Sequence, residues 1–219
     1  MEKIYLIIAL SPLVGALIAG LFGKQIGRAG AHWVTNIGVG ISFVLSLYAF
    51  YMHVWGGLPT YDATVYTWAA TDAFHFDVGF MVDRLTVLMM IVVTSVSLMV
   101  HIYTIGYMAD DPGYQRFFSY ISLFTFSMLM LVMANNLLQL FFGWEAVGLV
   151  SYLLIGFWYK KESAIFANLK AFIVNRVGDF GFLLGIAAIL MYTNTLDYAT
   201  FFERLPALAS VKVEYWPGV

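Results

Sequence analysis

Long apolar runs alternate with short polar connections along this chain. A run of about 18 or more apolar residues is long enough to cross a membrane as a helix. Six such runs are present, and they predict an all-α membrane protein with six transmembrane helices. The runs are residues 4–22, 31–53, 84–108, 117–133, 136–158 and 164–192. The first lacks the positive leader and the cleavage site of a signal peptide, so we expect it to be retained as a helix.

The connection between the second and third runs is long and has a pattern of its own. Residues 64–69 and 74–82 are rich in β-branched and aromatic residues and partly alternate, with Thr71 and Asp72 between them. This pattern predicts a short external hairpin. We expect its acidic residues to be solvated: Asp62, Asp72 and Asp77.

The segment after the sixth run is only moderately apolar. Residues 198–208 predict a short interfacial helix. The chain then stops at Trp216-Pro217-Gly218-Val219, which is a turn signal and not a natural domain end. We therefore expect the chain to be part of a longer protein.

Positive charge in the connections predicts the orientation. Lys and Arg occur in alternate connections, whereas residues 55–83 contain neither. The positive-inside rule therefore places the N-terminus outside and five cations at the inner side of the membrane. These cations are Lys24, Arg28, Arg116, Lys160 and Lys161.

Composition supports a lipid environment and excludes several functions. The chain is 62% hydrophobic and 11% charged, whereas soluble domains are about half apolar and about a quarter charged. A core of this size cannot hide that apolar excess from water. A net charge of −2 leaves no basic footprint for nucleic acid, and the absence of cysteine excludes disulfides, thiolate metal sites, iron–sulfur ligation and cysteine nucleophiles.

Glu145 is the clearest candidate for chemistry. It lies near the centre of the fifth run, where burial disfavours the charged form of a carboxylate. Ionisable groups at this depth are costly, and their default interpretation is functional. Glu145 is therefore a candidate proton site, and the competing interpretation is a protonated, hydrogen-bonded structural glutamate.

The sixth run carries three further ionisable residues. Arg176 and Asp179 are three residues apart, so they share a helix face and can pair. Asp179 lies at nearly the depth of Glu145, and Lys170 lies roughly 12 Å closer to the inner surface. A cluster of acids and bases at one depth is what a proton relay needs. The alternatives are a structural ion pair for Arg176 and Asp179 and a snorkelling side chain for Lys170.

Two histidines on adjacent runs raise the question of a haem. His53 ends the second run near the outer surface, whereas His101 lies in the inner half of the third. Their difference in depth argues against a shared iron. His101 is equally consistent with packing and with a relay role.

Three segments carry a resemblance to a known family. Residues 141–158, which read FFGWEAVGLVSYLLIGFW, resemble the fifth-helix signature of the largest antiporter-like subunit of respiratory complex I. That subunit is called L in bacteria and subunit 5 in mitochondria. Residues 170–179, KAFIVNRVGD, resemble its sixth helix. Residues 76–108, with Asp83-Arg84 and His101 in them, resemble the N-terminal region that separates this subunit from its shorter paralogues.

The resemblance implies an antiporter-like fold with discontinuous helices and inverted repeats. It implies proton translocation coupled to quinone reduction by NADH, in a bacterial plasma membrane or a mitochondrial inner membrane. Glu145 matches a fifth-helix glutamate that pairs with a seventh-helix lysine, which would lie beyond Val219. Arg176 and Asp179 match sixth-helix residues linked to activity, and Lys170 completes the expected site.

The resemblance also implies cofactors and partners. We expect no cofactor in this chain, because NADH, FMN, iron–sulfur clusters and quinone would be bound by other subunits. The expected partners are the lipid bilayer and other membrane subunits of complex I, especially a neighbouring antiporter-like subunit, and no nucleic acid. Residues 1–114 would form an N-terminal three-helix region with its external loop, and residues 115–219 would begin the first antiporter-like repeat. Two alternatives are the large subunit of a multi-subunit Na⁺/H⁺ antiporter and a non-conducting structural membrane module.

Overall fold

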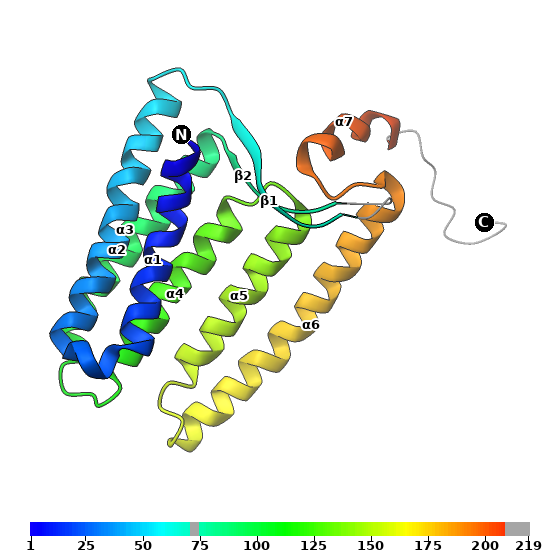
Figure 1. The fold of residues 1–219 in the computed structure, drawn as a ribbon. Helices are drawn as coiled ribbons and strands as arrows, with labels where there is room; N and C mark the ends of the chain where they lie inside the picture. Colours follow the sequence, from blue (N-terminus) through cyan, green and yellow to red (C-terminus); the bar gives the residue numbers. More distant parts are fainter. Residues whose placement is uncertain (71–74, 209–219) are drawn as a thin grey trace.

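Six long helices lie side by side in the computed structural model, which describes residues 1–70 and 75–208 (Figure 1). Each is long and apolar enough to cross a membrane, so the six predicted spans are confirmed. The helices are α1 (Glu2–Leu21), α2 (Gly23–Val54), α3 (Arg84–Tyr107), α4 (Tyr114–Val132), α5 (Leu137–Ile155) and α6 (Glu162–Thr193).

The helices form a bundle with an extension. α1 to α4 pack against one another, α5 packs on α4, and α6 packs on α5, so the last two helices continue the bundle as a row (Figure 1). The N-terminus and the connection between α2 and α3 lie at one end. The connections α1–α2, α3–α4 and α5–α6 lie at the other, and the five predicted inner cations lie in them or in the adjoining first turns of α2 and α4.

α2 begins earlier than predicted. Its first turn, from Gly23, is separated from the long helix by Gly27, whose φ of 69° and ψ of −173° are non-helical. Glycine adopts a positive φ at little steric cost, so the chain can reverse sharply there. Gly27 is the one residue with non-helical φ and ψ inside the six described spans.

A proline in α1 determines how α2 packs. Pro12 has no N–H, so the carbonyl of Ile8 lacks its helical donor. Ser42 of α2 donates its hydroxyl to that carbonyl at 2.6 Å. In a bilayer no water can replace such a donor. This side-chain hydrogen bond therefore fixes where α2 packs on α1.

Close approach of helices to α1 is achieved through small residues. Ser119 and Ser122 of α4 donate to the carbonyls of Ala16 and Pro12, at 2.7 and 2.8 Å. A Cβ added at Gly38 of α2 would lie 2.7 Å from the carbonyl oxygen of Ser11. Small residues at such positions allow backbones to touch, as is usual between membrane helices.

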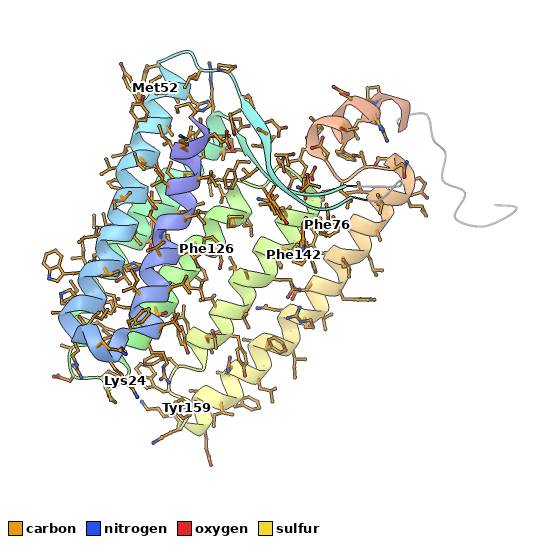
Figure 2. The ribbon with its side chains drawn as sticks, in the orientation of Figure 1. Lys24, Met52, Phe76, Phe126, Phe142 and Tyr159 are labelled. Atoms are coloured by element: carbon orange, nitrogen blue, oxygen red, sulfur yellow. The ribbon has the colours of Figure 1, made fainter. Side chains whose placement is uncertain are left out.

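The predicted hairpin is confirmed. Strands β1 (Tyr61–Ala70) and β2 (His75–Val82) are antiparallel, and the predicted turn at Thr71 and Asp72 lies outside the described residues. The hairpin extends across the outer ends of the helices (Figure 1). Phe76 lies beside Phe142 of α5, with ring centroids 6.1 Å apart (Figure 2).

Backbone hydrogen bonds dock β2 on the helices. Met81 N–H donates to the carbonyl of Met133 at 3.0 Å, and Gly79 N–H donates to the Gln139 side chain at 2.8 Å. A Cβ at Gly79 would lie 2.3 Å from the Asn135 amide nitrogen. β2 can therefore lie this close to the α4–α5 connection only because residue 79 is a glycine.

Two asparagines between α4 and α5 hold the outer end together. Asn136 caps α5 by accepting from Gln139 N–H at 2.7 Å, and its amide donates to the carbonyl of Asp77 at 2.9 Å. Asn135 donates to the Asp62 carboxylate at 3.1 Å. The expectation that the acidic residues are merely solvated is wrong for Asp77, because one of its carboxylate oxygens is buried. Asp62 is exposed but bonded, and Asp72 lies outside the described residues.

The short helix predicted near the end of the chain is confirmed as α7 (Tyr198–Leu208). Tyr198 N–H donates to the carbonyl of Asn135 at 3.2 Å, and Leu137 N–H donates to that of Leu196 at 2.9 Å. Burial raises the pKa of Tyr198 to about 12, so its phenol is neutral at physiological pH. The segment after α6 is thereby tied to the start of α5.

The pairing of Ser42 with the carbonyl freed by Pro12 predicts a coupling between two substitutions. Ser42→Ala should destabilise the protein by about 1–3 kcal/mol, because it leaves a buried acceptor unpaired. In a Pro12→Ala background the new N–H serves the same carbonyl, and the cost of Ser42→Ala should fall. Thermal unfolding of the single and double variants in detergent measures the coupling, and strictly additive effects would contradict it.

The close approach at Gly79 predicts that alanine destabilises the protein there but not at Gly40. Gly79→Ala should destabilise the hairpin junction by about 1–3 kcal/mol, because the new methyl group displaces Asn135 from its hydrogen bonds. Gly40→Ala is the matched control, since nothing lies within 4 Å of its added Cβ. The unfolding midpoint should drop for the first variant and not for the second. Equal unfolding midpoints for the two variants would contradict this prediction, because they would show that the junction accommodates the methyl group without loss of stability.

Candidate functional site

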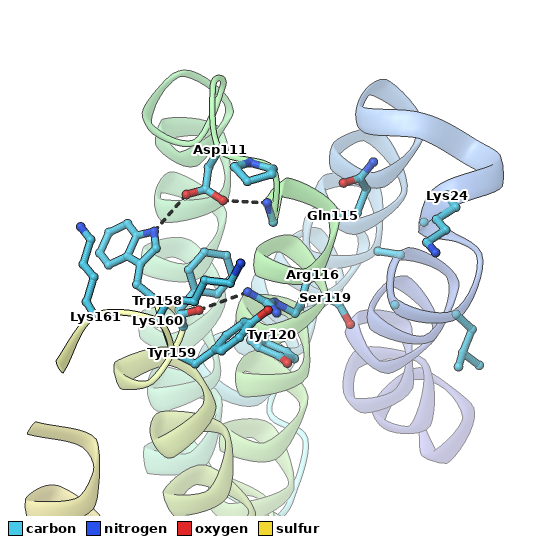
Figure 3. A pocket seen from close by; sticks show the side chains of 17 residues that line it. Lys24, Asp111, Gln115, Arg116, Ser119, Tyr120, Trp158, Tyr159, Lys160 and Lys161 are labelled. Atoms are coloured by element: carbon cyan, nitrogen blue, oxygen red, sulfur yellow. Dashed lines mark hydrogen bonds between the residues drawn. The ribbon is translucent and has the colours of Figure 1, made fainter. Parts of the chain in front are cut away.

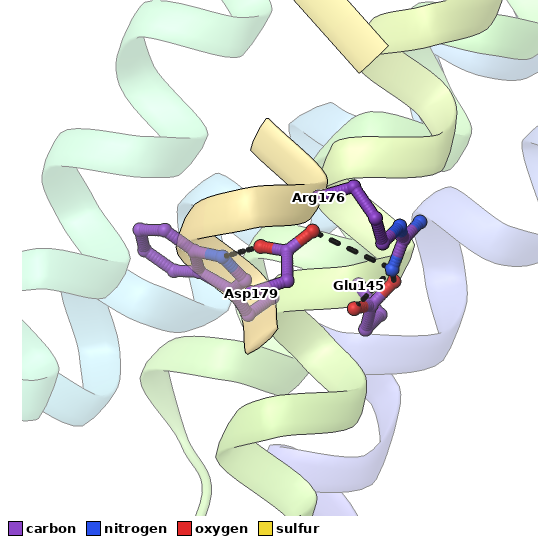
Figure 4. Close-up of polar contacts among 4 residues, drawn as sticks. Glu145, Arg176 and Asp179 are labelled. Carbon is purple, nitrogen blue, oxygen red and sulfur yellow. Dashed lines mark hydrogen bonds and ion pairs between the residues drawn. The ribbon is translucent and has the colours of Figure 1, made fainter. Parts of the chain in front are cut away.

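The predicted site residues lie on two antiparallel helices, α5 and α6. Glu145 projects from α5, whereas Arg176 and Asp179 project from α6 toward it (Figure 4). Asn136 caps the outer end of α5, and α6 ends at Asn194, whose left-handed φ of 52° terminates the helix. The short connection between the helices fixes their relative register, which sets the three residues at one depth.

Arg176 joins the two carboxylates. Its Nη1 atom lies 2.5 Å from both oxygens of Glu145 and 3.4 Å from an oxygen of Asp179. The predicted pairing of Arg176 with Asp179 on one helix face is confirmed, and so is the common depth of Asp179 and Glu145. The structure adds the bond to Glu145, so one cation serves one acid on each helix.

Trp144 also belongs to this group, although the sequence pattern did not single it out. Its indole N–H donates to Asp179 at 2.8 Å, and its ring packs edge-on against Phe182 at 5.9 Å. Asp179 is buried, and it is held by a neutral donor from α5 and a charged one from α6. A tryptophan directly before an intramembrane acid was the available signal, because an indole N–H in a bilayer has no water to accept its hydrogen bond.

The open side of the group carries charge. The side chain of Arg176 is 48% exposed and that of Glu145 is 23% exposed, while the guanidinium lies 5.0 Å from the ring centroid of Phe172. Most of α6 faces outward in the same way. Hydrocarbon does not solvate such charges, so this face requires contact with protein or water.

A small cavity adjoins the group on its inner side. It has a volume of about 10 Å³ and is lined by Gly148, Ser151, Asn175, Arg176 and Asp179, among others. A space of about 10–15 Å³ holds roughly one water molecule. The polar lining and the absence of a Cβ at Gly148 suit such a water.

Lys170 is not brought into this group. Among residues 1–70 and 75–208, its ammonium has no hydrogen-bond or ion-pair partner, and its side chain is exposed. It lies six residues before Arg176, which is about 9 Å along a helix. Lys170 therefore lies on the same helix as Arg176, closer to the inner end, without touching the group.

The two histidines of interest lie elsewhere and have separate partners. His53 bonds the Tyr5 hydroxyl at 2.8 Å, whereas His101 donates from Nδ1 to the carbonyl of Ser97 at 2.8 Å. The Nε2 atom of His101 is buried without a partner in the described part of the chain. Within that part, no three His, Cys, Asp or Glu residues are close enough to hold a metal ion.

Two family models match the chain. Residues 68–118 match the model described as the N-terminus of chain 5 of NADH-ubiquinone oxidoreductase (complex I). Residues 134–215 match the model described as the transmembrane region of NADH:quinone oxidoreductase and Mrp antiporters. The second model contains the whole of the Glu145, Arg176 and Asp179 group.

Curated relatives carry the same names. NADH-quinone oxidoreductase subunit L of Neisseria meningitidis serogroup B is 63% identical over 218 residues, which are 99% of this chain and 32% of the relative. NADH-ubiquinone oxidoreductase chain 5 of Arabidopsis thaliana is 47% identical over 212 residues, 97% of this chain and 31% of the relative. The chain thus spans about a third of the length of the curated relatives it matches.

A solved structure shares the fold. It is the membrane-bound sulfane sulfur reductase, an archaeal respiratory membrane complex, one chain of which superposes with a TM-score of 0.76. The match covers 91% of this chain and 39% of the other, at 18% sequence identity. The helix arrangement described above is therefore one that a respiratory membrane complex contains.

The indole of Trp144 provides a test of the group's integrity. Trp144→Phe removes the donor to Asp179 but keeps a ring against Phe182, so the protein should lose about 1.5–3 kcal/mol, the usual value of a hydrogen bond to a charged group. Trp33→Phe is the control, because the Trp33 indole makes no hydrogen bond to another described residue. The unfolding midpoint in detergent should fall only for Trp144→Phe, and an unchanged midpoint would contradict the assignment.

Proposed function

Because the chain belongs to the family of complex I subunits called L in bacteria and chain 5 in mitochondria, we propose that it takes part in proton translocation by NADH:quinone oxidoreductase. The chain is an integral membrane protein, as its six apolar helices and its bacterial and mitochondrial relatives indicate. In this proposal other subunits bind NADH, FMN, iron–sulfur clusters and quinone. The chain supplies acid and base groups that carry protons through the membrane.

The observation that carries the proposal is the bridging position of Arg176. One guanidinium contacts an acid on α5 and an acid on α6, each near the centre of its predicted span. Protonation of Glu145 would remove its charge and release Arg176 toward Asp179. Deprotonation would draw Arg176 back, so the proton occupancy of one acid controls the electrostatic environment of the other.

The surroundings of the group support proton movement through it. The adjoining cavity can accept about one water molecule beside Asp179. Lys170, exposed on the inner side of the same helix, is proposed as the next charged group along the path. The exposed face of α6 supports a covering partner, for which we propose a neighbouring membrane subunit of complex I.

Two other functions give different results in the same experiment. A large subunit of a multi-subunit Na⁺/H⁺ antiporter is suggested by the description of the second family model, but both curated relatives described above are complex I subunits. Such an antiporter would acidify vesicles under a Na⁺ gradient without NADH. A structural module would retain full pumping after replacement of both Glu145 and Asp179.

We predict that Glu145→Gln, introduced into the full-length subunit of the assembled complex, lowers NADH-driven proton pumping severalfold while assembly is retained. Glutamine keeps the size of the side chain but cannot bind a proton and does not attract Arg176. The measurement is the NADH-driven pH gradient in inverted membrane vesicles, with complex content determined on native gels.

Glu162→Gln is the matched control for this prediction. It makes the same chemical change at an exposed carboxylate in the first turn of α6. Pumping should be normal in that variant. Normal pumping in Glu145→Gln as well would refute the proposed role of Glu145.

A further inference from the structure

A wide cavity lies at the inner end of the molecule, far from the Glu145 group. Its volume is about 790 Å³, and it lies where the α1–α2, α3–α4 and α5–α6 connections meet (Figure 3). Cavities of about 300–1,000 Å³ are typical of sites for small ligands. The three connections are the ones that the positive-inside rule places in the inner aqueous phase.

The lining of this cavity is strongly cationic. Four of its residues are basic and one is acidic. In the described part of the chain, none of the four cations lies within 4.0 Å of a carboxylate. The basic residues are Lys24, Arg116, Lys160 and Lys161, and the acid is Asp111.

Asp111 offsets at most one of these four positive charges, and its own hydrogen bonds go to neutral donors. It accepts from the Trp158 indole at 2.9 Å and from Gly113 N–H at 2.7 Å (Figure 3). The indole hydrogen bond is the main reason that the pKa of Asp111 lies below its usual range, so the group is ionised at neutral pH. Its role is to hold the α3–α4 connection against the end of α5.

Arg116 is held ready for an anion. Its guanidinium donates to the carbonyl of Phe157 at 3.1 Å and lies 4.6 Å from the centroid of the Phe157 ring. Its Nε–H is buried without an acceptor among the described residues. A guanidinium that lines the cavity and is fixed by a carbonyl and an aromatic ring suits the oxygens of a phosphate group.

The rim of the cavity combines aromatic and aliphatic groups. Trp158 and Tyr159 are amphipathic residues of the kind found at headgroup depth, and Lys161 lies 4.7 Å above the Trp158 ring. Leu21, also part of the lining, is 70% exposed. The cavity therefore offers positive charge inside and an apolar edge toward the acyl chains of the bilayer.

We propose that this cavity binds a phosphate-bearing anion, supplied by the headgroup of an anionic phospholipid in the inner leaflet. Basic pockets between membrane helices on this side recognise such headgroups by the same combination of charges. Soluble phosphate offers the same oxygens but leaves the apolar rim unused. The cavity is separate from the group formed by Glu145, Arg176 and Asp179, so this proposal does not depend on the proposed function.

The test uses the full-length subunit in its purified complex, stripped of lipid in detergent. The complex is titrated with micelles containing dioleoyl phosphatidylglycerol, with dioleoyl phosphatidylcholine as the zwitterionic probe, and bound lipid is measured by native mass spectrometry. Lys160→Gln combined with Lys161→Gln should weaken phosphatidylglycerol binding by about fivefold per cation, or roughly thirtyfold for the pair. Phosphatidylcholine binding should be weaker and unaffected.

Lys3→Gln combined with Arg84→Gln is the matched control, because both are exposed cations at the outer end. This control should bind phosphatidylglycerol as the wild type does, and Lys24→Gln should weaken binding independently. Competition by millimolar inorganic phosphate would identify free phosphate as the source of the same anion chemistry. Equal binding by all variants would overturn the proposal, as would carbodiimide cross-linking of Lys160 to a carboxylate of a neighbouring subunit.

Discussion

Every backbone polar group inside a bilayer must find its partner within the protein, and this constraint explains most of the structure. It produces six helices, whose backbones satisfy themselves. It also explains the exceptions, because the carbonyl freed by Pro12 accepts the hydroxyl of Ser42. The same rule applies to charge at mid-depth, where Arg176 serves both Glu145 and Asp179. Helix packing and the arrangement of the charged residues thus both follow from the need for partners inside the protein.

The sequence predicted those features that repeat along it. Apolar runs predicted the spans, and alternation in residues 64–69 and 74–82 predicted the hairpin. Spacing along a single helix predicted the pairing of Arg176 with Asp179, because residues three apart share a face. The depth of Glu145 followed from its place in its run. Each of these predictions depended on local geometry alone.

Contacts between distant segments could not be predicted in this way. The bond from Trp144 to Asp179 and the docking of Gly79 on Gln139 depend on the register between helices, which no local pattern specifies. Asp77 was expected to be solvated, since nothing in its neighbours showed that α5 would cover it. The early start of α2 depended on the positive φ of Gly27, which glycine permits but does not require.

The docking of the hairpin has a consequence for biosynthesis. Gly79 bonds to Gln139, a residue 60 positions later in the chain, so the hairpin leaves the ribosome well before its partner does. During translation it must remain undocked on the outer side until α3, α4 and the start of α5 have been inserted. The hairpin therefore docks only after the Asn135–Asn136 segment and the start of α5 are in place.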